Sequence, residues 1–166
     1  RGKGTLMLAR KVPGDPIDII GPLGNPFPLP PAGAPVMLIG GGIGVVPLLF
    51  LQDILRTNYI IFILGLRTQN STPLSHEELR LRDIHIVTED GGLGYKGTAI
   101  DLLRIKWVES GKEGTTIYGC GPGGMLKALK AFALEKKVPC YVSLEVPMGC
   151  GLGACQSCAV PRSDRL

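Results

Sequence analysis

The run of residues 36–47 is Val36-Met37-Leu38-Ile39-Gly40-Gly41-Gly42-Ile43-Gly44-Val45-Val46-Pro47. Its apolar start predicts a buried strand, its glycines predict a tight turn, and Val46 begins a segment with helical periodicity. A turn of this kind directs backbone N–H groups and a helix N-terminus toward a pyrophosphate. Pro47 stands where the common dinucleotide fingerprint has its third glycine, so a purely structural turn remains an alternative at this point.

Short apolar runs alternate with amphipathic segments from Val36 onward, which predicts βα units and a parallel sheet. The predicted strands are Val36–Ile39, Tyr59–Leu64, Ile84–Val87, Thr116–Tyr118 and Tyr141–Glu145. The predicted helices are Val46–Arg56, a short one after Ser75, Ala99–Val108 and Gly124–Lys136. We therefore expect an α/β fold with a five-stranded, doubly wound parallel sheet that binds its ligand at the carboxyl ends of the strands.

The first thirty residues differ from the rest in their pattern. Thr5–Arg10 and Ile17–Ile20 are predicted as two strands, followed by a stiff turn and a proline-rich linker that runs to Pro35. Two strands do not make a stable domain alone. We therefore expect residues 1–33 to be the end of a β-barrel whose beginning precedes Arg1.

Composition narrows the class of function. Hydrophobic residues make up 45% of the 166 residues and charged residues 19%, and the net charge of +4 is spread along the chain with no basic run longer than two residues. This distribution argues against a nucleic-acid groove or a membrane-surface patch. The uncharged stretch between Gly33 and Leu51 resembles a membrane span in length, but its prolines and glycines break it into a strand, a turn and a helix.

Cysteine usage carries the most specific signal. Cys150, Cys155 and Cys158 follow the C-x4-C-x2-C spacing of plant-type 2Fe–2S proteins, and the intervening glycines let backbone N–H groups approach the sulfurs. A zinc site or free thiols are the alternatives. No cysteine occurs among the eight residues after Cys158, so we expect residues 147–166 to be a partial cluster-binding segment whose fourth ligand follows Leu166. Five cysteines without a regular framework also favour a reducing cytoplasm.

A second glycine-rich strand end is Tyr118-Gly119-Cys120-Gly121-Pro122-Gly123-Gly124-Met125. Here the backbone can approach a flat ring closely, and Cys120 is expected at the strand end facing a cleft. A plain core thiol is the alternative for Cys120.

Together these three motifs resemble the ferredoxin-reductase superfamily, in which a G-G-G-x-G-x-x-P turn and a C-G-P-x-x-M segment bind the pyridine nucleotide. Within it, the chain resembles the electron-transfer subunit family of dihydroorotate dehydrogenase B. The segments that carry this closer resemblance are Gly2-Lys3-Gly4-Thr5, Gly21-Pro22-Leu23-Gly24, Glu89-Asp90-Gly91 with Lys96-Gly97, and Ser143-Leu144-Glu145.

The resemblance implies that residues 34–146 bind NAD and that the barrel remnant contacts FAD. The residues that match the nucleotide motifs are Gly41, Gly42, Gly44, Pro47, Cys120, Gly121, Pro122 and Met125. Gly4 and Thr5 match the flavin-contacting segment. Lys3 is a candidate for the flavin pyrophosphate or a solvated lysine, and Glu145 for a flavin edge or a backbone amide.

The implied function is an electron relay in pyrimidine biosynthesis, for which no catalytic acid–base pair is needed. Electrons would pass between NAD and the FMN of a separate catalytic subunit through FAD and the 2Fe–2S cluster, in a heterotetramer. A sulfide dehydrogenase or NADH-dependent ferredoxin:NADP oxidoreductase subunit is the alternative within this chemistry. A non-enzymatic nucleotide-binding or zinc-stabilised module is the alternative from another class.

Overall fold

The computed structural model describes residues 2–110 and 113–160, without the side chain of His76. These residues divide into two compact units. One unit spans 27–146 and contains the sheet, and the other consists of the described residues up to Pro26 and from Pro147 onward.

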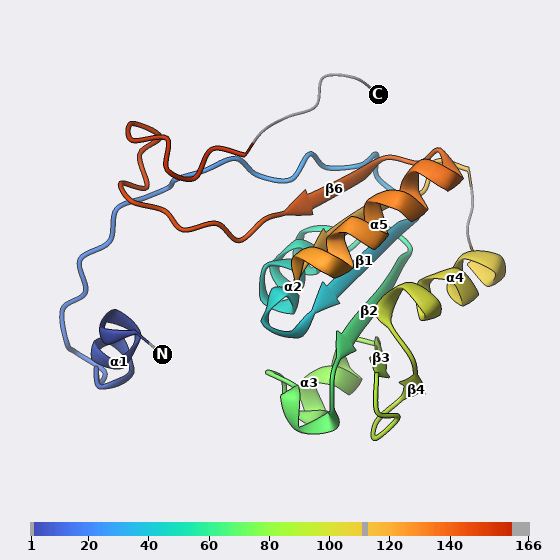
Figure 1. Ribbon diagram of the computed structural model, residues 1–166, viewed down its shortest axis with the longest axis horizontal. Coiled ribbons are helices and arrows are strands. Elements are labelled where there is room, and N and C mark those ends of the chain that lie inside the picture. The colour runs from blue at the N-terminus through green and yellow to red at the C-terminus, as the bar shows by residue number, and fades with distance from the viewer. Residues whose placement is uncertain (1, 111–112, 161–166) are drawn as a thin grey trace. The chain divides into compact units, whose positions relative to one another are not determined.

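A single parallel sheet forms the centre of the 27–146 unit (Figure 1). Its strands are β1 (Val36–Gly41), β2 (Ile60–Leu66), β3 (Ile84–Thr88), β4 (Tyr95–Lys96), β5 (Thr116–Cys120) and β6 (Cys140–Ser143). Their order is β4-β3-β2-β1-β5-β6, and every neighbouring pair is parallel. The α/β fold with a doubly wound parallel sheet is thus confirmed.

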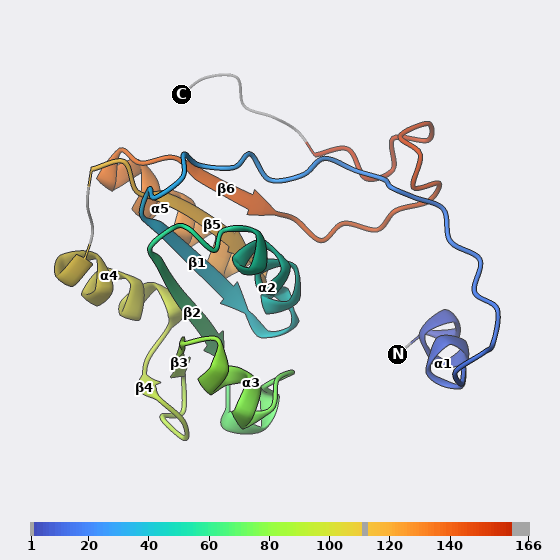
Figure 2. The same cartoon turned by 180° about the vertical axis from the view of Figure 1, so that it is seen from behind.

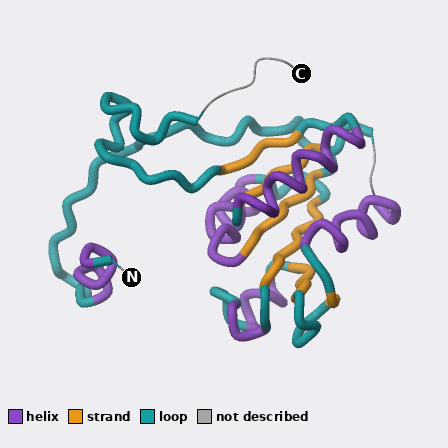
Figure 3. Tube along the Cα trace, viewed as in Figure 1, coloured by secondary structure: helices purple, strands orange, loops and turns teal. Residues whose placement is uncertain are grey.

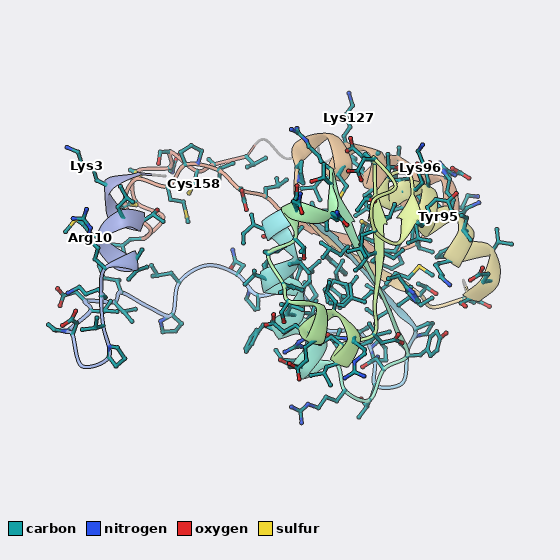
Figure 4. The ribbon with its side chains drawn as sticks, turned by 90° about the horizontal axis from the view of Figure 1, so that it is seen from below. Lys3, Arg10, Tyr95, Lys96, Lys127 and Cys158 are labelled. Carbon is teal, nitrogen blue, oxygen red and sulfur yellow. The ribbon has the colours of Figure 1, made fainter. Side chains whose placement is uncertain are left out.

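The sheet has six strands where five are predicted. The additional strand is β4, a two-residue edge strand that pairs Val87 with Tyr95 and Thr88 with Lys96 (Figure 4). A strand of two exposed residues has no periodic pattern, so the sequence offers no signal for it. It forms because a turn after β3 returns the chain to the same edge, where the Thr88 hydroxyl donates to the Leu93 carbonyl at 2.9 Å.

Helices cover both faces of the sheet (Figure 2). They are α2 (Val45–Ile54), α3 (His76–Leu81), α4 (Ala99–Ser110) and α5 (Gly123–Lys136), with short 3-10 turns at Gly42–Gly44 and Gln69–Ser71. One apolar cluster joins Leu38 and Phe62 to α2 and α3, and the other joins Met37 and Ile63 to α4 and α5. All six residues of β1 are buried, because the strand is central and covered on both faces.

The strand prediction for Thr5–Arg10 is wrong. Residues Lys3–Ala9 form a helix, α1, and Ile17–Ile20 have no regular secondary structure (Figure 3). Strands need neighbours to satisfy their backbone groups, and in the described chain residues 3–9 pair with no strand. Leu6, Met7, Leu8 and Ala9 are good or acceptable helix formers, so the backbone hydrogen bonds close locally.

None of the helices within the described residues is long and apolar enough to cross a membrane. The uncharged stretch after Gly33 folds as β1, the glycine turn and α2. Its prolines and glycines therefore act as the sequence predicts.

Candidate functional site

The glycine turns after β1 and β5 meet at one edge of the sheet. The two strands are neighbours, and Gly40 pairs with Cys120 at their carboxyl ends. From there the chain continues into α2 on one face and α5 on the other. Such a point, where the strand order reverses, is where open α/β sheets bind their ligands.

The two turns pack so closely that side chains are excluded between them. A Cβ added to Gly44 would lie 2.4 Å from the carbonyl oxygen of Cys120. One added to Gly121 would lie 2.9 Å from the Cα of Gly41. Gly44 and Gly121 are therefore glycines because two backbones touch.

Pro122 and Met125 complete this contact from the α5 side. A Cβ on Gly41 would lie 2.6 Å from the Pro122 ring and 2.9 Å from the Met125 sulfur. The structure thus brings together Gly41, Gly44, Cys120, Gly121, Pro122 and Met125 from the two predicted nucleotide motifs.

Beside the contact, part of the backbone is open. Gly42 has a φ of +54°, and a Cβ added to Gly42, Gly123 or Gly124 would meet no atom within 4 Å. The residues that precede α2 and α5, Gly44 and Pro122, make no side-chain capping hydrogen bond. At α5 the first backbone N–H groups have no intrahelical partner and carry partial positive charge, which suits a phosphate. At α2 the N–H of Val45 already donates within the preceding 3-10 turn, so that helix contributes mainly its partial positive charge.

Gly123 and Gly124 were not among the site residues predicted from the sequence. They occupy the variable positions of the C-G-P-x-x-M segment, so the motif itself draws no attention to them. Pro47 lies in the first turn of α2, where a missing N–H removes no intrahelical bond.

Cys120 is buried rather than presented at a free surface of its unit. Its side chain is 2% exposed and packs in the apolar cluster that contains Tyr118. Burial raises the pKa of the Cys120 thiol, the charge of Glu145 raises it further, and a hydrogen bond with Ser143 opposes them. Cys120 is therefore a neutral thiol. Glu145 follows β6 and is exposed, and both residues stay predicted site residues.

The three predicted flavin contacts lie in the other unit. Lys3, Gly4 and Thr5 form the first turn of α1 and are exposed (Figure 4). Their assignment to a flavin stays a prediction.

The cysteine loop surrounds two of its sulfurs with hydrogen-bond donors. The Cys150 sulfur accepts from the backbone N–H of Leu152 at 3.3 Å and of Cys155 at 3.5 Å. These bonds, the one from Cys155 foremost, lower the pKa of Cys150. Hydrogen bonds with the hydroxyl and the backbone N–H of Ser157, and then those with Cys150, lower the pKa of Cys155 to about 6.

Iron–sulfur clusters are held by cysteine thiolates, and hydrogen bonds to the sulfurs stabilise the thiolate form. The sulfur chemistry of the loop therefore fits a 2Fe–2S cluster. Positive φ angles at Gly151 (+70°) and Gly153 (+79°) allow the curl that the spacing predicts. Among residues 2–110 and 113–160, no three His, Cys, Asp or Glu side chains are gathered in a group that could hold a metal ion. The ligand role of Cys150, Cys155 and Cys158 stays a prediction, and residues 161–166 of the predicted segment lie outside the described residues.

Comparison with curated proteins finds close relatives. The chain is 41% identical over 169 residues to the dihydroorotate dehydrogenase B (NAD(+)) electron transfer subunit of Bacillus caldolyticus, an alignment that covers 98% of this chain and 63% of the relative. The subunit of the same description from Desulforamulus reducens is 41% identical over 164 residues, covering 96% of this chain and 61% of the relative. The chain thus spans somewhat over 60% of the length of these relatives. No family model matches the chain.

Solved structures agree on the fold. The NADH-dependent reduced ferredoxin-NADP oxidoreductase, from a study of flavin-based electron bifurcation, superposes with a TM-score of 0.79 at 33% identity, over 95% of this chain and 57% of that one. A full-length cytochrome P450 from Tepidiphilus thermophilus superposes with a TM-score of 0.51 at 24% identity, over 72% of this chain and 15% of that one. The second match supports the fold alone.

Proposed function

Because this chain is homologous over nearly its whole length to electron transfer subunits of dihydroorotate dehydrogenase B, we propose that it is part of such a subunit. Its activity is then to relay electrons between NAD and an FMN-containing catalytic subunit that oxidises dihydroorotate in pyrimidine biosynthesis. The observation that carries this proposal is the meeting of the two glycine turns at the carboxyl ends of β1 and β5.

The NAD pyrophosphate is assigned to these turns. The open backbone at Gly42, Gly123 and Gly124 and the N-terminus of α5 supply N–H donors, and the N-termini of α2 and α5 both supply positive potential. The close contact around Gly41, Gly44 and Gly121 holds the two turns at a constant separation, so the donors are positioned before the nucleotide arrives. This assignment gives residues 34–146 the role of the NAD-binding domain.

FAD is assigned to the N-terminal segment, residues 1–33, as the end of a flavin domain. Gly4, Thr5 and Lys3 are its proposed contacts. Glu145, which belongs to the 27–146 unit, is kept as a candidate for a flavin edge or a backbone amide. Support comes from the homology and from the flavin-based chemistry of the structural relative. When bound, a flavin couples hydride transfer at a nicotinamide to single-electron transfer at a cluster.

The 2Fe–2S cluster is assigned to Cys150, Cys155 and Cys158. The backbone N–H groups of Leu152 and Cys155 stabilise thiolate at Cys150, and Ser157 does so at Cys155. We place the subunit in the cytoplasm, where thiols stay reduced, and in a heterotetramer with its catalytic partner.

The test uses the full-length protein, purified without oxygen and reconstituted with its catalytic subunit. Iron and acid-labile sulfide should be present in equal amounts, and NADH should reduce an artificial acceptor. Cys155→Ser should abolish electron transfer to the catalytic subunit while NADH oxidation by the artificial acceptor continues. Unchanged reduction of the partner by Cys155→Ser would contradict the proposed relay.

Two alternatives give different results in the same assays. Zinc without iron identifies a zinc-stabilised module. The similarity to the ferredoxin-NADP oxidoreductase supports a second candidate, a subunit that transfers electrons between NADH, NADPH and ferredoxin. That candidate predicts reduction of ferredoxin or NADP by the purified protein and no coupling to dihydroorotate oxidation.

A further inference from the structure

Ser157 connects the backbone of the cysteine loop to one of the proposed cluster ligands. The backbone N–H of Gly149 donates to the Ser157 hydroxyl oxygen at 3.0 Å. The same oxygen lies 3.2 Å from the sulfur of Cys155. The Gly149 N–H, the Ser157 hydroxyl and the Cys155 sulfur are therefore linked in series.

Which atom donates in the contact between Ser157 and Cys155 follows from the protons that each group carries. A serine hydroxyl has one proton to donate and accepts through its lone pairs. The Gly149 N–H donates to a lone pair of the Ser157 oxygen. The hydroxyl proton of Ser157 is therefore still available to the sulfur. A ligating cysteine is a thiolate with no proton to donate, so Ser157 is then the donor and the Cys155 sulfur the acceptor.

Gly149 keeps this arrangement compact. A Cβ added at Gly149 would lie 3.2 Å from both the Cys155 sulfur and the Ser157 oxygen, so the absence of a side chain lets the backbone approach both atoms. Hydrogen bonds to ligand sulfurs stabilise the more negative, reduced state of an iron–sulfur cluster and thereby raise its reduction potential.

We propose that Ser157 is a positioning residue that raises the reduction potential of the 2Fe–2S centre by donating a hydrogen bond from its Gly149-anchored hydroxyl to the sulfur of Cys155. The proposal rests on the proposed function, because it requires the cluster. The reduction potential of the cluster then depends in part on Ser157, a side chain that is not a ligand.

The test measures the midpoint potential of the cluster in the full-length protein by redox titration followed by electron paramagnetic resonance. Ser157→Ala should lower the potential, so that the reduced-to-oxidised ratio at a given solution potential falls by about three- to tenfold, tenfold being about 59 mV for one electron. Ser157→Thr keeps the hydroxyl and should retain the original potential. Met148→Ala, which truncates a side chain 71% exposed in the same loop, is the matched control and should also leave it unchanged.

Several results would overturn the proposal. They are an unchanged potential in Ser157→Ala, an equal decrease in Ser157→Thr or Met148→Ala, or loss of iron and sulfide from Ser157→Ala alone, which would make the hydroxyl necessary for assembly and not for tuning. Absence of iron and sulfide from the unmodified protein would reject the proposed function itself. A cluster of unaltered potential in the variant would reject only this inference.

Discussion

At Gly44 the absence of a Cβ atom matters both for the stability of the sheet and for the shape of the proposed nucleotide site. The space that its Cβ would need is occupied by the backbone of Cys120, which cannot rotate away as a side chain could. Its glycine identity is thus explained by packing, and its effect on a ligand is indirect, through the position of the two turns.

We predict that Gly44→Ala lowers the free energy of unfolding by about 3 kcal/mol, at the upper end of overpacking effects, and weakens NADH binding. Urea denaturation and a fluorescence titration with NADH measure the two effects. Gly124→Ala is the control for the denaturation measurement alone, because its Cβ meets no atom within 4 Å outside its own helix and alanine is the better helix former. A Gly44→Ala protein as stable as Gly124→Ala would contradict the close contact.

Tyr118 offers a second test at single-residue scale. Its ring is fully buried, and its hydroxyl donates to the Pro28 carbonyl at 2.6 Å. Tyr118→Phe should keep the ring contacts with Phe27 and Tyr141 but cost about 1 kcal/mol, since it removes a hydrogen bond. Tyr141→Phe, a change on the exposed stacking partner, should cost less than about 0.5 kcal/mol in the same denaturation assay. If both changes lowered the free energy of unfolding equally, the Tyr118 hydrogen bond would not contribute to stability.

Among the elements, α4 has a reciprocal cap at its N-terminus. The Asp101 carboxylate accepts from the Thr98 hydroxyl at 2.7 Å and from the Thr98 N–H at 2.8 Å, and the Asp101 N–H donates back to the hydroxyl at 3.2 Å. The bond from the hydroxyl and then that from the amide lower the pKa of Asp101. The cap therefore stabilises the fold through the ionised carboxylate.

Asp101→Asn should lower the free energy of unfolding by about 0.5–1 kcal/mol at neutral pH. Because the folded pKa lies below the ordinary aspartate value, this stabilisation is complete above that value and is lost as pH falls through the folded pKa. The difference between the two proteins in urea should therefore close in acid. Glu113→Gln, an exposed change in the turn before β5, serves as the control, and a difference that persists unchanged in acid would refute the charged cap.

The helix α1 shows the limit of reasoning from single elements. Thr5–Arg10 contains residues that suit a strand or a helix, and the choice depends on whether neighbouring strands are available to pair. In the described chain residues 3–9 pair with no strand and form a helix. The strands of the sheet did not present this ambiguity, because each has neighbours in the same unit.

For the whole molecule, the 27–146 unit has its own two-sided core. We predict that residues 27–146, expressed alone, unfold in urea in one cooperative transition, at a midpoint close to that of the same unit in the longer chain. Circular dichroism and tyrosine fluorescence should give coincident curves. Broad or non-coincident curves would show that the sheet needs the other segments to fold.

The local sequence patterns were enough to predict the α/β class, the central strands, most helices and both glycine turns. Apolar periodicity and glycine positions act over a few neighbouring residues, so they can be recognised in the sequence. The same patterns could not predict β4, which is too short to show a period, or α1, whose alternative conformation depends on distant partners. They also could not show that Gly44 and Gly121 are packed against each other's turns. Those contacts join residues about eighty positions apart in the sequence, and only the folded chain brings their atoms within reach.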